Sequence, residues 1–147
     1  MAIIKLLTGS VYGTAEAVAT EVKAALEQSG HTVIKAEGLD AVLRDGADAV
    51  LVCTSTTGQG DLPENLLLLY QELKERFPLL GHLAYGIIAL GDSSYGDTYC
   101  GGGRLMDELL TELTAKRVAE PLMIDASETA SPETIAVPWA VEWASQL

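Results

Sequence analysis

The sequence has 147 residues, 48% of them hydrophobic, which predicts one folded domain over residues 1–147 and argues against a disordered chain. Nine basic residues stand against 21 acidic ones, and this net charge of -12 argues against a protein that binds nucleic acid or an anionic membrane surface. No apolar run reaches the roughly 18 residues of a membrane span, and the amino-terminal stretch is too short and poorly flanked for a signal peptide, so we expect a cytoplasmic protein.

Apolar runs and helix-like periodicities alternate along the chain. The runs are short and nearly continuous, which is typical of strands covered on both faces. Between them, apolar residues recur at helix spacing, as at Val18, Val22 and Leu26. Gly30 follows that helix where a terminating glycine is favoured. The predicted strands cover residues 2–8, 32–37, 48–53, 83–90 and 117–124, the last broken or bent by Pro121. The predicted helices cover residues 15–29, 63–77, 102–114 and 132–146, with a connector at 39–46.

This alternation predicts an α/β fold, in which a five-stranded parallel sheet carries helices on both faces. The first, third and fourth strands are each followed by a loop rich in hydroxyl side chains and glycine. We therefore expect these three strands to be neighbours. The strand order 2-1-3-4-5 satisfies this and places the switch point between strands 1 and 3, where open parallel sheets bind their ligands.

The first of these loops, Thr8 to Glu16, suits a phosphate group. It joins a strand to a helix N-terminus, where unpaired N–H groups favour an anion. Its glycines permit close approach, and Ser10 and Thr14 add hydroxyl donors. The loop holds no lysine or arginine and no Gly-x-Gly-x-x-Gly pattern, which disfavours a nucleoside triphosphate or a dinucleotide and favours a phosphate monoester. The alternative is a plain N-capping turn without a ligand.

The second and third loops suit a flat ring. Two glycines in the stretch from Thr57 to Asp61 allow a peptide to turn its carbonyl toward a ring nitrogen that gains a proton on reduction. Leu90 to Tyr95 offers backbone amides to the ring edge, and the aromatic face of Tyr95 suits stacking. Tyr99 is a second candidate wall. The alternative for these tyrosines is ordinary packing within the loop.

The cysteines and histidines indicate neither a metal site nor a catalytic group. Cys53 ends an apolar run and is expected to be a buried hydrophobic residue, whereas Cys100 lies in a glycine-rich stretch and is expected to be more accessible. Their spacing does not suit metal ligation, and we expect no disulfide. His31 and His82 are expected on the surface. We therefore predict no catalytic residues and no metal.

The chain resembles the flavodoxin family over nearly its full length, in particular the short-chain bacterial members of the YqcA and MioC type. The resemblance rests on the stretch from Thr54 to Pro63, on Ala89 to Tyr95, and on Leu122 to Glu128 followed by Pro138 and Trp139. The first loop is similar to the Ser/Thr-x-Thr-Gly-x-Thr phosphate loop of flavodoxins. The resemblance implies a flavodoxin-like three-layer sandwich that binds FMN non-covalently.

The resemblance also implies a set of cofactor-binding residues. By motif position, the phosphate would contact Ser10, Val11, Tyr12, Gly13, Thr14 and Ala15, and the inner side of the ring Ser55, Thr56, Thr57 and Gly58. The outer side would be formed by Leu90, Gly91, Asp92, Ser93, Tyr95, Tyr99 and Cys100, with Asp125 as a further contact. The chain departs from the family pattern at Tyr12, where threonine is usual, at Thr57, where an aromatic residue is frequent, and by one additional residue after Tyr95.

The function implied is that of a low-potential one-electron carrier rather than an enzyme. It would shuttle electrons from an NADPH-dependent flavodoxin or ferredoxin reductase to acceptor redox proteins as a monomer. The acidic excess is explained by solubility or by steering toward basic partners. Two alternatives remain open: an FMN-binding accessory or regulatory module, and a small FMN-dependent quinone reductase. A signalling receiver is disfavoured, because no acidic cluster follows the first strand.

Overall fold

The computed structural model describes residues 2–10, 13–44, 46–56, 61–92 and 99–147. Within them, parallel strands form one sheet in the order β2-β1-β3-β4-β5, and β6 pairs with β4 beyond β5. The strands are β1 (Ile3–Gly9), β2 (Thr32–Lys35), β3 (Ala49–Thr54), β4 (Ala84–Gly91), β5 (Lys116–Arg117) and β6 (Leu122–Asp125). The predicted fold class and strand order are confirmed.

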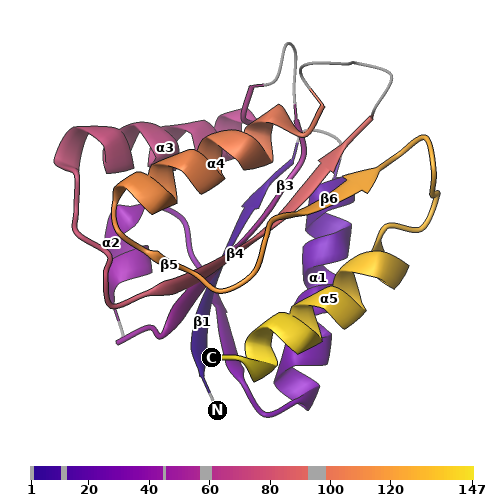
Figure 1. Ribbon diagram of the computed structural model, residues 1–147, viewed down its shortest axis with the longest axis horizontal. Helices are drawn as coiled ribbons and strands as arrows, with labels where there is room; N and C mark the ends of the chain where they lie inside the picture. Colours follow the sequence, from indigo (N-terminus) through magenta and orange to yellow (C-terminus); the bar gives the residue numbers. More distant parts are fainter. Residues whose placement is uncertain (1, 11–12, 45, 57–60, 93–98) are drawn as a thin grey trace.

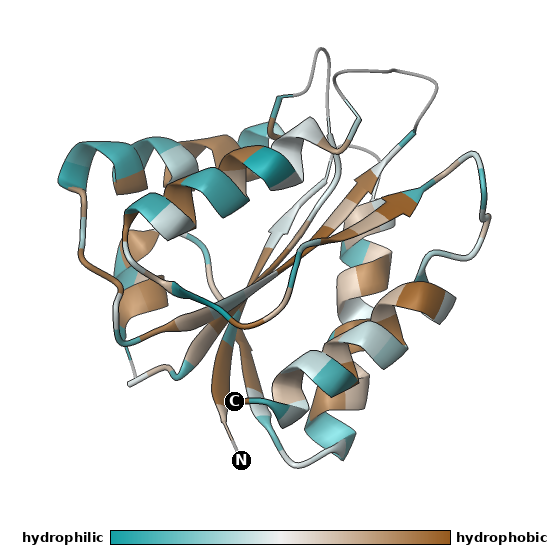
Figure 2. Cartoon of the chain, viewed as in Figure 1, coloured by the Kyte–Doolittle hydropathy of each residue, from teal (hydrophilic) through white to brown (hydrophobic). Residues whose placement is uncertain are grey.

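Helices cover both faces of the sheet (Figure 1). The helices are α1 (Thr14–Gln28), α2 (Leu39–Leu43), α3 (Glu64–Arg76), α4 (Gly101–Glu112) and α5 (Glu133–Ser145). One buried cluster joins the sheet to α2, α3 and α4, and a second joins it to α1 and α5. The strands are hydrophobic along most of their length, whereas α3 and α4 turn hydrophilic residues outward (Figure 2). Among the described residues, no helix has the length and apolar character needed to cross a membrane.

The predicted element boundaries agree with the observed ones within two residues, with one exception. The predicted strand 117–124 is divided into β5 and β6, and both parts pair with β4. Pro121 lies directly before β6 and has no N–H group to donate to the ladder, which accounts for the break. The predicted connector 39–46 contains the short helix α2.

Two helices end in the same hydrogen-bonded turn but with different residues at its left-handed position. After α1, Gly30 (φ 94°) donates to the Glu27 carbonyl, and the next N–H donates to the Leu26 carbonyl. After α4, Thr114 takes the same position at φ 71°, although it carries a branched side chain. Such a conformation is unfavourable for any residue with a Cβ atom and is usually given to glycine.

We expect the substitution Thr114→Gly to raise the free energy of unfolding by about 1 kcal/mol, because it relieves this backbone strain at an exposed site. Urea denaturation would measure the change. The matched control is Gly30→Thr, which introduces the same strain after α1 and should lower stability by a similar amount. A Thr114→Gly protein that is no more stable than the unaltered chain would contradict this assignment.

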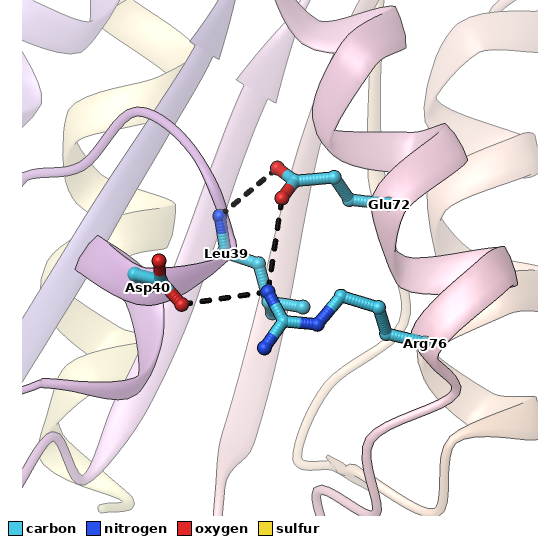
Figure 3. Close-up of polar contacts among 4 residues, drawn as sticks. All are labelled: Leu39, Asp40, Glu72 and Arg76. Atoms are coloured by element: carbon cyan, nitrogen blue, oxygen red, sulfur yellow. Dashed lines mark hydrogen bonds and ion pairs between the residues drawn. The ribbon is translucent and has the colours of Figure 1, made fainter.

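The short helix α2 is capped by a side chain from α3 (Figure 3). Glu72 Oε1 accepts the N–H of Leu39, the first residue of α2, at 3.2 Å. Arg76 Nη1 lies 3.4 Å from Asp40 Oδ1 and 3.9 Å from Glu72 Oε2. The preceding residue, Gly38, has no side chain with which to cap the helix. Glu72 therefore supplies from a neighbouring helix the acceptor that an N-cap residue normally provides.

Replacing Glu72 by alanine should lower the free energy of unfolding by about 1 kcal/mol, since an uncapped α2 loses its first hydrogen bond. Asp40→Ala removes only an exposed ion pair and should cost less than about 0.5 kcal/mol. Chemical denaturation of the two variants, with Glu75→Ala as a control on the same helix, would compare them. Equal losses for Glu72→Ala and Asp40→Ala would show that the ion pair, not the cap, stabilises α2.

Candidate functional site

The carboxyl ends of β1, β3, β4 and β6 lie side by side at one edge of the sheet. This edge is opposite the one where the chain termini lie (Figure 1). In the β1–β3 pairing, Gly9 lies beside Thr54, and in the β3–β4 pairing Thr54 lies beside Ala89. At the last residue of β4, the β4–β6 pairing sets Gly91 beside Asp125. The three loops predicted to form the site therefore start next to one another, at the edge where parallel sheets bind ligands.

The first loop is fixed where β1 ends. Ser10 donates its N–H to Asn65 Oδ1 at 3.1 Å, and Gly13 donates its N–H to Ser10 Oγ at 2.8 Å. Gly13 precedes α1 as its N-cap residue in a left-handed conformation (φ 85°), and within the described residues no side chain caps the first N–H groups of the helix. Thr14 is exposed in the first turn, and Ala15 is buried.

This loop fits a phosphate monoester. The uncapped N-terminus of α1 leaves N–H groups without an intrahelical partner, and they lie at the positive end of the helix dipole. The hydroxyl groups of Ser10 and Thr14 are neutral donors beside them. An added Cβ on Gly13 would meet no atom of the described residues within 4 Å beyond its chain neighbours, so this side of the residue leaves room for a ligand. Val11 and Tyr12, also predicted to contact the phosphate, lie outside the described residues.

The second loop begins between β1 and α4. Ser55 donates its N–H to the Gly9 carbonyl at 2.9 Å, and Thr56 Oγ1 accepts the N–H of Gly102 at 3.2 Å. A Cβ at Gly102 would lie 2.8 Å from the Ser55 carbonyl oxygen, so only glycine permits this approach. These contacts fix the two residues that precede the predicted ring contacts Thr57 and Gly58, which themselves lie outside the described residues.

The third loop leaves β4 at Gly91, and its far end packs against the same residue. A Cβ on Gly91 would lie 2.8 Å from the Cys100 backbone nitrogen and 3.2 Å from the Tyr99 ring, so both residues pack closely against the end of β4. Leu90 is buried, and Gly91 and Asp92 are half-buried. Ser93 and Tyr95 lie outside the described residues, so the stacking role of Tyr95 stays a prediction.

The prediction that Cys100 is accessible is wrong. Its side chain is fully buried and its Sγ donates to the Ala89 carbonyl at 3.6 Å, at the start of α4. The thiol therefore packs into the sheet, and burial raises its pKa. Cys53 is buried as predicted, and burial raises its pKa to about 12. Both cysteines are free thiols. The sequence misled because a glycine-rich stretch here forms a tightly packed helix start.

Tyr99 and Asp125 both lie beside Gly91 at this edge of the sheet. The pKa of Tyr99 is raised to about 12, first by loss of solvent and then by Cys100, Asp125 and Glu128. Asp125 Oδ1 accepts the N–H and the hydroxyl of Ser127 at 2.9 and 2.8 Å, which fixes the turn after β6. The structure thus brings Tyr99, Cys100 and Asp125 beside Gly91, and their contact with a cofactor stays a prediction.

Asn65 is a site residue that sequence reasoning missed. It is the only asparagine in the chain and lies in the first turn of α3, but nothing in its spacing indicates that it reaches Ser10 across the sheet edge. The histidines lie elsewhere: His82 is exposed as predicted, whereas His31 is half-buried and its Nδ1 accepts the N–H of Ala2 at 3.1 Å. In the described part of the chain, no group of three or more potential ligands could hold a metal ion.

Comparison with known proteins agrees with this geometry. A family model described as flavodoxin matches residues 6–139. Flavodoxin YqcA of Escherichia coli is 46% identical, over 100% of this chain and 99% of that protein, and protein MioC of Escherichia coli is 36% identical over the same shares. A solved cysteine-to-alanine variant of a flavodoxin from Pseudomonas aeruginosa is 45% identical, over 99% of this chain and 98% of the other, with a TM-score of 0.92.

A parallel sheet in this order, with three loops rich in glycine and hydroxyl side chains at its carboxyl edge, is typical of open α/β proteins that bind a mononucleotide. The chain belongs to the flavodoxin family, whose members are FMN-binding electron-transfer proteins.

Proposed function

We propose that this chain is a short-chain flavodoxin that carries one non-covalently bound FMN on a single domain of residues 1–147. The observation that carries the proposal is the N-terminus of α1, which no described side chain caps. It follows the hydrogen bond between the Gly13 N–H and Ser10 Oγ, and β1, which leads to it, pairs with β3 at the edge where β3 and β4 end. The short-chain assignment is supported by the fifth strand, whose two parts are separated only by residues 118–121.

When bound, FMN supplies one-electron redox chemistry through its isoalloxazine ring. The protein's contribution is position and charge. We propose that Ser10, Gly13, Thr14 and Ala15 hold the phosphate, together with Val11 and Tyr12. The ring would lie between the residues from Ser55 to Gly58 on the inner side and those from Leu90 to Tyr95, with Tyr99, on the outer side. Cys100 would contact the ring through its backbone, because its thiol is buried.

Carboxylates surround this edge of the sheet. Glu16 and Glu64 lie in the first turns of α1 and α3, and Asp61 and Asp92 lie beside the loops proposed to hold the ring. Negative charge near the ring disfavours the addition of an electron, so we propose a low reduction potential. The same charge would attract the basic surface of an NADPH-dependent flavodoxin or ferredoxin reductase and of acceptor redox proteins.

The carrier role is tested by electron flow through the FMN-loaded protein. With NADPH, a flavodoxin reductase and a one-electron acceptor, the protein should raise the rate of acceptor reduction in proportion to its concentration, and added salt should slow the transfer. FMN binding without reduction by the reductase would favour an accessory or regulatory module. Reduction of quinones by NADPH without any reductase would favour a small quinone reductase, and either result would overturn the carrier role.

A further inference from the structure

Asn65 links two of the three loops by a contact between residues far apart in the sequence. Its Oδ1 accepts the Ser10 N–H at 3.1 Å, across 55 positions of the chain. Because an N–H group bonds only to an acceptor, the carbonyl side of this amide faces Ser10. Asn65 lies in the first turn of α3, which follows the second loop, whereas Ser10 begins the first loop. The contact therefore joins the start of the phosphate loop to the end of the ring loop.

Tight packing beneath this bond holds α3 in place. A Cβ at Gly9 would lie 2.5 Å from Thr54 Oγ1 and 3.0 Å from the Leu66 Cβ, so glycine allows α3 to approach the end of β1. Leu66 is buried and follows Asn65 directly. The amide of Asn65 is thus carried by a helix turn that is anchored in the core, although Asn65 itself is exposed.

The bond from Asn65 continues into the phosphate loop. With its N–H held by Asn65, Ser10 places its hydroxyl oxygen 2.8 Å from the backbone nitrogen of Gly13, the N-cap residue of α1. The stretch from Thr8 to Glu16 has no cationic side chain. An anion at this loop would be held by neutral dipoles alone, and these stabilise it only when they are oriented together.

We propose that Asn65 is a positioning residue that orients Ser10 and its hydrogen bond to Gly13, and thereby sets the preference of the site for a flavin with a phosphate group over one without it. The inference rests on the proposed function, because it assumes that the phosphate of FMN lies beside Ser10 and Gly13. It assigns to α3 a role in phosphate recognition, although no residue of α3 belongs to the phosphate loop.

The test compares FMN with riboflavin, which lacks the phosphate. In Asn65→Leu, which keeps the approximate shape but removes the acceptor, the affinity for FMN should fall about three- to tenfold, the value of one neutral hydrogen bond. The affinity for riboflavin should change by less than about twofold. Flavin fluorescence quenching measures both dissociation constants. The matched control is Gln71→Leu, an exposed amide on the same helix, which should leave both affinities unchanged.

A second readout needs no flavin. The Ser10 amide should exchange its hydrogen at least about tenfold faster in Asn65→Leu than in the unaltered chain, while the amides of β1 keep their protection. Equal losses of FMN and riboflavin affinity, an unchanged FMN affinity, or unchanged exchange at Ser10 would each overturn the role of Asn65. Failure of the unaltered chain to bind FMN would overturn the proposed function and this inference with it.

Discussion

Replacing Trp143 by alanine should lower the free energy of unfolding by about 3–5 kcal/mol, the largest loss expected from a single substitution in this chain. The side chain is 1% exposed and is among the largest fully buried ones. Its Nε1 donates to the Tyr85 carbonyl at 3.2 Å, and its ring stacks on Trp139 with centroids 6.3 Å apart. It also covers Gly86, where a Cβ would lie 2.7 Å from the indole. Removing it therefore leaves a cavity between α5 and the sheet.

Two further variants separate the causes of this loss. Trp139→Ala removes the half-buried partner of the stack and should cost less than Trp143→Ala, because less apolar surface becomes exposed to water. Gly86→Ala should cost about 1–3 kcal/mol through overpacking, since the hydrogen bond to Tyr85 prevents Trp143 from moving aside. Urea denaturation measures all three. A Trp143→Ala protein no less stable than Trp139→Ala would contradict the packing of α5.

Stability should fall steeply above pH 9 because of the buried thiol of Cys53. Its pKa is raised from 9.0 to about 12 by burial, so the folded state keeps its proton over a range in which the unfolded chain releases it. The stability that this thiol contributes is fully present below pH 9 and decreases between pH 9 and 12. The slope expected from one such group is about 1.4 kcal/mol per pH unit.

Denaturation series at pH 8, 9 and 10 test this prediction in the lower part of the range. The pKa values of Tyr85 and Tyr99 are raised from 10.0 to about 12, so these tyrosines change the pH dependence of stability mainly above pH 10. Cys53→Ala should flatten the slope between pH 9 and 10. Cys100→Ala provides a comparison, since burial also raises the pKa of that thiol. An unchanged slope in Cys53→Ala would mean that other groups cause the alkaline loss.

The fold was predictable because local pattern and topology agree. The apolar runs mark the strands, and the need to bring three special loops together selects one strand order, which the structure has. The location of the site follows from the same argument, since Gly9, Thr54 and Gly91 end neighbouring strands. The periodicity along the chain is therefore enough to identify the carboxyl edge of the sheet as the location of the candidate site.

Features that depend on contacts between distant segments were not predictable in this way. The burial of Cys100 depends on the close approach of the start of α4 to Gly91, and the hydrogen bond between Asn65 and Ser10 depends on the approach of α3 to Gly9. Neither approach leaves a periodic signal in the sequence. His31 likewise gains its contact from the backbone of Ala2, at the start of the neighbouring strand. The predicted contacts of Tyr12, Thr57 and Tyr95 stay predictions.

The most direct test of the central claim is a flavin titration of the protein after its own flavin has been removed. If Ser10, Gly13 and the N-terminus of α1 hold a phosphate monoester, FMN should bind one to one with quenching of its fluorescence. Riboflavin and FAD should bind more weakly, since the first lacks the phosphate and the second carries a pyrophosphate. No binding of FMN, or FAD binding as tight as FMN binding, would contradict the account.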